Sequence, residues 1–271
     1  MKEYSILQNI ANQINILGAF CGKRDVAELT SEQLMKSYGV PQADVMVLFG
    51  GSILCGGDVL AQAMKNHVAK RYVIVGGAGH TTETLRRKMQ EEFPEIETAG
   101  LPEAEVFARY LKHQYGLVPD FLECKSTNCG NNITYLLELL QEKGISFQSI
   151  ILSQDATMQC RMEAGLRKYV SDKIQIINYA VYEAQVIVEH SELEYEKEIW
   201  GMWDMERYIS LLMGEIPRLT DDENGYGPEG KNFIAHVDIP TEVRNAFEQL
   251  RNAYPGFVRE ANPLYASSSV L

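Results

Sequence analysis

Two apolar runs in this chain end abruptly in glycine, and this pattern constrains the fold more than any other feature. Residues 44–49 are followed by Gly50 and Gly51, and residues 71–75 by a second glycine turn at 76–77. Each run predicts a buried strand that stops at a tight turn. Because glycine lacks a Cβ, its backbone amide can approach a bound anion closely. The sequence therefore predicts a small-molecule site where these strands end.

Helical and strand patterns alternate along the first two thirds of the chain. Strands are predicted at 44–49, 72–75, 121–124, 149–152 and 174–177, and helices at 57–70, 81–93, 102–115, 132–143 and through Arg161. Strands alternating with helices of this length indicate a parallel sheet wound by right-handed crossovers. We predict an α/β fold: a Rossmann-like parallel sheet with flanking helices, over residues 1–182. Its helical leader comprises a helix at 4–19 and one from Thr30.

The last third of the chain has a different pattern. The strand signal disappears after Tyr182, and a helix-rich region with Trp200, Trp203 and Tyr208 follows. We expect these aromatic residues to be core residues of a smaller, mainly helical C-terminal domain or cap at 183–271. A final helix is predicted at 241–254, after a concentrated turn signal.

Composition narrows the class of protein. The formal charge of −12, without a basic cluster, opposes nucleic-acid binding. Five cysteines without a Cys-x-x-Cys pair indicate reduced thiols and a cytoplasmic location. No apolar run is long enough for a signal sequence or a membrane span. The apolar face of the first helix leaves two alternatives open, a homodimer contact or internal packing.

Polar, glycine-rich loops follow four of the predicted strands. In an open parallel sheet such loops meet beyond the carboxyl ends of the strands, where ligands bind. One glycine pair alone is equally well explained as a tight turn, but four such loops favour a site. Thr81 or Thr82 is expected to cap the helix after the second loop. The candidate ligand-binding residues are Gly50, Gly51, Ser52, Gly76, Gly77, Gly79, His80, Glu103, Glu123, Ser126, Asn128, Asn132, Ser153, Gln154 and Asp155.

Several known site types do not match these loops. The Gly77-x-Gly79 pattern lacks the third glycine of a dinucleotide fingerprint, and no strand-end acid follows about twenty residues later, which disfavours NAD. The glycines at 51 and 56 have phosphate-loop spacing, but the required Lys and Ser/Thr are absent, which excludes that type of ATPase. No Gly-x-Ser-x-Gly elbow, His-x-x-x-His pair or cysteine cluster occurs, so we expect neither a serine hydrolase nor a metal site.

Two residues are candidates for acid–base chemistry. His80 follows the glycine loop and titrates near neutral pH, although an ordinary loop histidine explains it equally well. Glu103 offers a carboxylate, although acids are also common in a first helical turn. Asn128 and Asn132 would either cap a helix or donate to a ligand. Cys129 would need a neighbouring base to act as a nucleophile, and its sequence neighbours supply none.

Several motifs together resemble the SanA/ElyC/YdcF family, and most closely its YdcF branch. They are Val-Leu-Phe-Gly-Gly at 47–51, Val-Ile-Val-Gly-Gly at 73–77, Pro-Glu-Ala-Glu at 102–105, Glu-x-x-Ser-Thr-Asn-x-x-x-Asn at 123–132 and Ser-Gln-Asp-x-Thr-Met-Gln at 153–159. With further similarity at 203–218 and 221–230, the resemblance covers about 40–240. It implies a Rossmann-like domain with a small helical domain, and a nucleotide-like ligand with S-adenosylmethionine as the leading candidate. The family's biochemical activity is largely unassigned.

The resemblance also bears on catalysis. This chain has Asn131 where the family usually has Glu, Cys129 where Thr is common, and no histidine near Thr157, where many members carry one. An acid–base pair of that His and Glu would be missing here. Three hypotheses stay open: a small-molecule-binding protein; an enzyme, either a methyltransferase or a hydrolase of phosphorylated envelope precursors, using Glu103 or His80; and an interaction module without a ligand.

Overall fold

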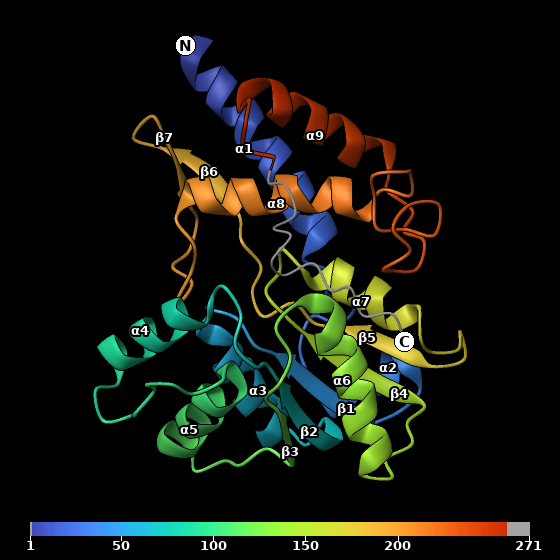
Figure 1. The fold of residues 1–271 in the computed structure, drawn as a ribbon. Helices are drawn as coiled ribbons and strands as arrows, with labels where there is room; N and C mark the ends of the chain where they lie inside the picture. The colour runs from blue at the N-terminus through green and yellow to red at the C-terminus, as the bar shows by residue number, and fades with distance from the viewer. Residues whose placement is uncertain (1, 259–271) are drawn as a thin grey trace.

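A five-stranded parallel sheet forms the larger part of the molecule, and a mainly helical lobe packs beside it (Figure 1). The computed structural model describes residues 2–258. The strand order is β3-β2-β1-β4-β5, and every pairing in this sheet is parallel. The predicted Rossmann-like α/β fold is therefore confirmed. The strands are β1 (Ala43–Phe49), β2 (Ala69–Val75), β3 (Phe121–Glu123), β4 (Ser149–Ser153) and β5 (Gln175–Asn178).

Helices cover both faces of the sheet, which explains why the strands are apolar on both sides. Alternate residues of β1 point to opposite faces: Val45 and Val47 belong to one buried cluster, and Met46 and Leu48 to the other. The first cluster is covered by α6 (Cys129–Glu142) and α7 (Gln159–Arg167), and the second by α3 (Cys55–Lys65), α4 (Thr82–Glu92) and α5 (Glu103–Tyr115).

Local residues account for where several elements begin. Helix α6 begins at Cys129, three residues before the predicted start at 132, because Asn128 is its N-cap. The Asn128 side chain accepts from the Asn131 amide, and the Asn131 side chain accepts from the Asn128 amide, which is a capping box. Thr30 caps α2 (Ser31–Tyr38) through the Gln33 amide. The predicted helix at 57–70 was too long, since α3 ends at Lys65 and His67 adopts a left-handed turn with φ 52° before β2.

The second lobe combines the two ends of the described chain. It contains α1 (Lys2–Cys21), α8 (Met205–Leu219), α9 (Thr241–Ala253) and a hairpin of β6 (Val186–Glu189) and β7 (Glu192–Tyr195). The helix predicted at 4–19 is α1, which packs mainly on α9, β6 and α8 (Figure 1). Gly18 makes room for this packing, because a Cβ there would lie 2.7 Å from the Tyr208 hydroxyl.

The prediction that no strand follows Tyr182 is wrong. Strands β6 and β7 pair antiparallel, with Val186 opposite Tyr195. The two-residue turn is His190-Ser191, with φ values of 50° and 66°. Turns of this kind favour Asn-Gly or Asp-Gly, so the sequence lacked the usual hairpin signal.

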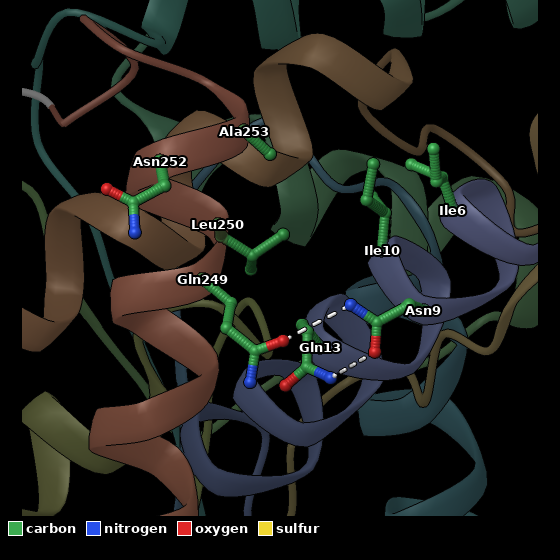
Figure 2. A pocket seen from close by; sticks show the side chains of 8 residues that line it. All are labelled: Ile6, Asn9, Ile10, Gln13, Gln249, Leu250, Asn252 and Ala253. Atoms are coloured by element: carbon green, nitrogen blue, oxygen red, sulfur yellow. Dashed lines mark hydrogen bonds between the residues drawn. The ribbon is translucent and has the colours of Figure 1, made fainter. Parts of the chain in front are cut away.

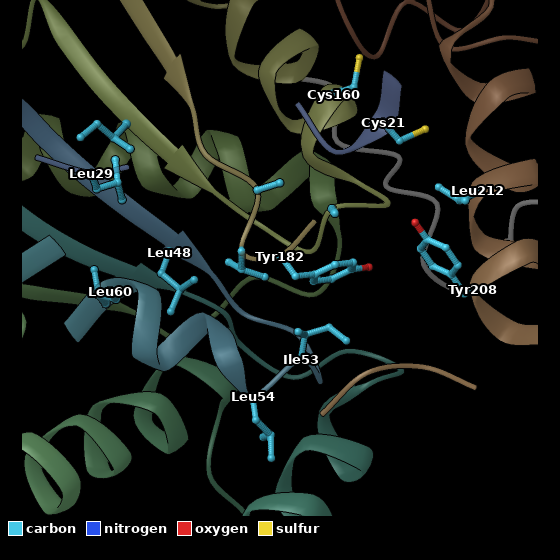
Figure 3. Close-up of a cluster of buried hydrophobic side chains, with 14 of the residues drawn as sticks. Cys21, Leu29, Leu48, Ile53, Leu54, Leu60, Cys160, Tyr182, Tyr208 and Leu212 are labelled. Atoms are coloured by element: carbon cyan, nitrogen blue, oxygen red, sulfur yellow. The ribbon is translucent and has the colours of Figure 1, made fainter. Parts of the chain in front are cut away.

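One hydrophobic core joins the lobe to the sheet domain (Figure 3). Tyr208 and Leu212 of α8 and Cys21 of α1 belong to the same buried cluster as Leu48 of β1 and Tyr182. The predicted core role is confirmed for Tyr208, which is 1% exposed. All five cysteines are free thiols.

The apolar face of α1 is mostly used inside the molecule. Ile14 and Leu17 are fully buried, whereas Ile6 is 60% exposed beside a groove of about 360 Å³ between α1 and α9 (Figure 2). Asn9 bridges the groove by donating to the Gln249 amide oxygen at 3.2 Å. Within residues 2–258, every helix is too short or too polar to cross a lipid bilayer.

Candidate functional site

The loops after β1, β2, β3 and β4 meet at the carboxyl edge of the sheet, as the sequence predicts. The Gly50 amide donates to the Val75 carbonyl at 2.6 Å, and the Gly76 amide to the Glu123 carbonyl at 2.9 Å. From the other side, the Gln154 side-chain amide donates to the Gly50 carbonyl at 3.4 Å. A Cβ on Gly51 would lie 3.8 Å from the Gln154 side-chain oxygen. The four loops thus contact one another along the edge of the sheet through hydrogen bonds and close packing.

The topological switch point of the sheet lies between β1 and β4, because the chain winds outward from β1 to β3 and then crosses back to β4. Ser52 follows β1, and Ser153 ends β4 opposite Leu48. Ser52 is 1% exposed and Ser153 is fully buried. Within residues 2–258, these two hydroxyl oxygens are the buried side-chain polar atoms that lack a hydrogen-bond partner. Buried polar groups are normally paired, so both require an explanation.

On the β2 side, the glycine amides are engaged inside the protein. The Gly77 amide donates to the Ser126 hydroxyl at 3.2 Å, and the Gly79 amide donates to the Thr82 hydroxyl at 2.7 Å. A Cβ on Gly77 would lie 2.2 Å from the Ser126 carbonyl oxygen. The glycines here serve close loop packing, and the expectation that their amides point freely toward an anion is wrong.

Thr81 and Thr82 differ from their predicted capping role. Neither caps α4 with its side chain, and both hydroxyls instead donate to Oε1 of Glu103, at 3.1 and 2.9 Å. Glu103 is held from the backbone as well, since its own amide donates to the Gly77 carbonyl at 2.9 Å. The first turn of α5 is therefore tied to the loop after β2.

Glu103 is the carboxyl group that packs most closely on the glycine loops. It is 7% exposed, and Cβ atoms on Gly50 or Gly76 would lie 2.6 and 3.3 Å from its Oε2 atom. Burial raises the pKa of Glu103, although the Thr82 and Thr81 hydroxyls act in the opposite direction. Such a carboxyl can hold or release a proton closer to neutral pH than an exposed one.

The third loop is ordered by its own side chains. The Glu123 carboxylate accepts from the Lys125 amide at 2.5 Å and from the Ser126 amide at 3.2 Å. Asn128 caps α6, as its capping interpretation predicts, and the half-buried Asn132 lies one turn into this helix. His80 lies on the exposed side of the second loop. Glu123 and Asn128 thus stabilise the loop after β3 and the start of α6.

The fourth loop is built around Asp155, which is 4% exposed. Its Oδ1 atom accepts from the Thr157 hydroxyl at 3.0 Å and from the Tyr182 hydroxyl at 2.7 Å. The Gln154 backbone amide donates to the side-chain oxygen of Gln159, and the Gln159 side-chain amide donates to the Leu152 carbonyl. The Asp155 carboxylate therefore binds groups of the protein itself and is not exposed to a ligand.

Trp203 lies at the candidate site, and the sequence did not predict this position. Its indole N–H donates to Oδ2 of Asp155 at 2.8 Å, and its side chain is half-buried. The sequence predicts a core residue here, and the side chain is only half-buried. The two partners are far apart in sequence, and no spacing rule connects a helix-flanking tryptophan to a strand-end aspartate.

Other cavities and clusters lie away from the strand edge. A cleft of about 600 Å³ is lined by residues of α3 together with Glu28, Tyr115 and Tyr179, and by none of the candidate residues. Among the described residues, Glu189, His190 and Glu194 form a group with metal-like spacing, at the exposed tip of the β6–β7 hairpin. This group does not take part in the strand-end site.

No protein-family model matches this sequence. The main observation that bears on function is therefore the geometry of the strand edge, where the hydroxyls of Ser52 and Ser153 have no hydrogen-bond partner within residues 2–258.

Proposed function

We propose that this chain binds a small molecule at the carboxyl edge of its sheet, between the ends of β1 and β4. The observation that carries this proposal is that the buried hydroxyls of Ser52 and Ser153, at the switch point, have no hydrogen-bond partner in the part of the chain that the structure describes. A ligand that hydrogen-bonds both would remove the cost of burying them unpaired.

The ligand is nucleotide-like in this proposal, and S-adenosylmethionine is the leading candidate from the resemblance to the SanA/ElyC/YdcF family. A purely anionic ligand, such as free phosphate, has less support. The amides of Gly76, Gly77 and Gly79 already have protein acceptors, and Glu103 adds a buried carboxyl group nearby.

Titration calorimetry with S-adenosylmethionine and with adenosine tests this proposal. We expect Ser153→Ala to weaken binding by about tenfold, the loss typical of one buried hydrogen bond. Ser149→Ala, at the opposite end of β4, is the matched control and should bind normally. Native mass spectrometry of freshly purified protein adds an independent measurement. Absence of any bound metabolite, together with no binding heat from either compound, would overturn the proposal.

Glu103 favours an enzyme as the second candidate, either a methyltransferase or a hydrolase acting on phosphorylated envelope precursors. Its raised pKa and its place against Gly50 and Gly76 suit a general acid or base. His80 is the weaker choice because it is exposed. Glu103→Gln should abolish turnover of a copurifying metabolite, and turnover that survives both Glu103→Gln and His80→Ala would exclude this mechanism.

A further inference from the structure

A short segment between β7 and α8 covers the strand edge, and we call residues 199–204 the strap. Its backbone meets the loop after β1, since the Cys55 amide donates to the Trp200 carbonyl at 3.2 Å. Gly201 has φ 80°, and a Cβ there would lie 2.6 Å from the Leu54 nitrogen. The strap therefore lies in direct contact with the loop that contains Ser52.

The two ends of the strap are held differently. At one end, the Trp200 ring packs against Phe93 and Tyr110, with ring centroids 5.9 and 5.3 Å apart. At the other end, the Trp203 ring is half-buried and its indole N–H donates to Asp155 at 2.8 Å. The Trp203 carbonyl accepts from the Tyr195 hydroxyl at 3.2 Å, and the Arg207 guanidinium lies 5.7 Å from the ring centroid. A packed aromatic cluster resists opening more than a few polar contacts at a half-buried ring do. Trp200 thus marks the fixed end and Trp203 the releasable end.

Lys88 of α4 holds the middle of the strap. Its ammonium group donates to the Gly201 carbonyl at 2.6 Å and lies 5.5 Å from the centroid of the Trp203 ring. Burial and the neighbouring Arg87 lower the pKa of Lys88, and Asp155 and Asp204 act in the opposite direction. Apart from Asp204, which is the N-cap of α8, the strap lies outside the helices and strands. Its contacts with the sheet domain are therefore these side-chain contacts and the Cys55–Trp200 backbone hydrogen bond.

We propose that the strap is the movable wall of the strand-end site, with Trp203–Asp155 and Lys88–Gly201 as its two latches. Beneath the strap, Ser52, Leu54 and Asp155 are at most 4% exposed, whereas Trp203 and Gly201 are half-buried. A ligand that reaches Ser52 and Ser153 requires the Trp203 end to open. This consequence rests on the proposed binding function, but the opening itself is measurable without any ligand.

Two tryptophans are present, so Trp200→Phe leaves Trp203 as the single fluorescent reporter and keeps an aromatic ring at the fixed end. In that background, Lys88→Met removes one latch. Lys65→Met is the matched control, because Lys65 lies 4.2 Å from the centroid of the Tyr115 ring and away from the strap. We expect Lys88→Met alone to raise acrylamide quenching of Trp203.

Hydrogen exchange of the 199–204 amides in Lys88→Met should accelerate about fivefold, the factor that corresponds to one net hydrogen bond, while β1 amides remain unchanged. Equal quenching and exchange in the Lys88→Met and Lys65→Met proteins would overturn the proposal. A titration with S-adenosylmethionine separates the two proposals. If the strap opens in Lys88→Met but the protein does not bind S-adenosylmethionine, the strap proposal stands and the binding function is contradicted. If the protein binds but the strap does not respond to Lys88→Met, the binding function stands and the strap proposal is contradicted.

Discussion

The two sides of the strand edge differ in how completely their polar groups are paired. On the β2–β3 side, the amides of Gly76, Gly77 and Gly79 all have acceptors, and the Glu123 carboxylate binds its own loop. On the β1–β4 side, the hydroxyls of Ser52 and Ser153 are buried without a partner among residues 2–258. The polar groups of the β2–β3 side thus bind one another, whereas the two serine hydroxyls of the β1–β4 side are the groups on which the proposed binding rests.

The largest expected effect is a steric one on the β2–β3 side. In Gly77→Ala the new Cβ would lie 2.2 Å from the Ser126 carbonyl oxygen, and both groups belong to backbone that must shift. We expect a loss of about 3 kcal/mol in the free energy of unfolding, measured by urea denaturation. Gly79→Ala is the control, because its Cβ would lie 3.2 Å from an exposed loop carbonyl. Similar losses in both variants would contradict close packing at Gly77.

Ser126→Ala removes the acceptor of a buried amide on the same side. The Gly77 N–H then has no partner, and we expect the free energy of unfolding to fall by about 1–3 kcal/mol. Ser52→Ala, across the edge, should show no such loss because its hydroxyl has no partner in the described chain. If the two variants lose equal stability, the two sides do not differ as described.

Glu103 contacts the loops of both sides, so its titration reports on the boundary between them. Because its pKa is raised in the folded protein, the folded state binds this proton more tightly than the unfolded state does. The free energy of unfolding should therefore fall as pH rises from the unfolded pKa through the folded pKa, then level off. Each unit of difference between the two values corresponds to about 1.4 kcal/mol.

Urea denaturation of Glu103→Gln across this pH range checks the titration. The variant should lack the fall in stability, because its amide does not ionise and can still accept from Thr81 and Thr82. Glu105→Gln, in the same turn of α5, should retain the pH dependence of the natural protein. A Glu103→Gln protein with unchanged pH dependence would assign that dependence to another group.

The smallest expected effect is on the β1–β4 side. Ser153→Ala deletes a buried hydroxyl without breaking a hydrogen bond in the described chain, so the free energy of unfolding should stay constant or rise by up to about 1 kcal/mol. Thermal and urea denaturation measure this. A clear loss of stability would mean that Ser153 has a structural role, and the contrast between the two sides would be lost.

The sequence predicted the sheet because its signals are local. Residues 44–49 and 71–75 are apolar runs that end in glycine, and these runs became β1 and β2. The meeting of four loops then followed from the rule that parallel strands end at one edge. The β6–β7 hairpin was missed because His190 and Ser191 form a turn that those residue types rarely adopt.

The pairing within the site was not predictable in the same way. Whether the Gly77 amide faces a ligand or the Ser126 hydroxyl depends on the distance between two loops 49 residues apart. The Trp203–Asp155 contact likewise depends on how the helical lobe sits on the sheet. Composition and spacing carry no information about either distance, so such contacts need coordinates.

The pairing of α1 with α9 also has a consequence for biosynthesis. Ile14 and Leu17 lie in the core that α9 helps to close, yet the ribosome completes α9 long after α1. During translation, the sheet strands can pair while the apolar face of α1 still awaits its partner. Folding of the helical lobe is therefore completed only when the end of the described chain has been made, because α9 supplies the last surface against which α1 packs.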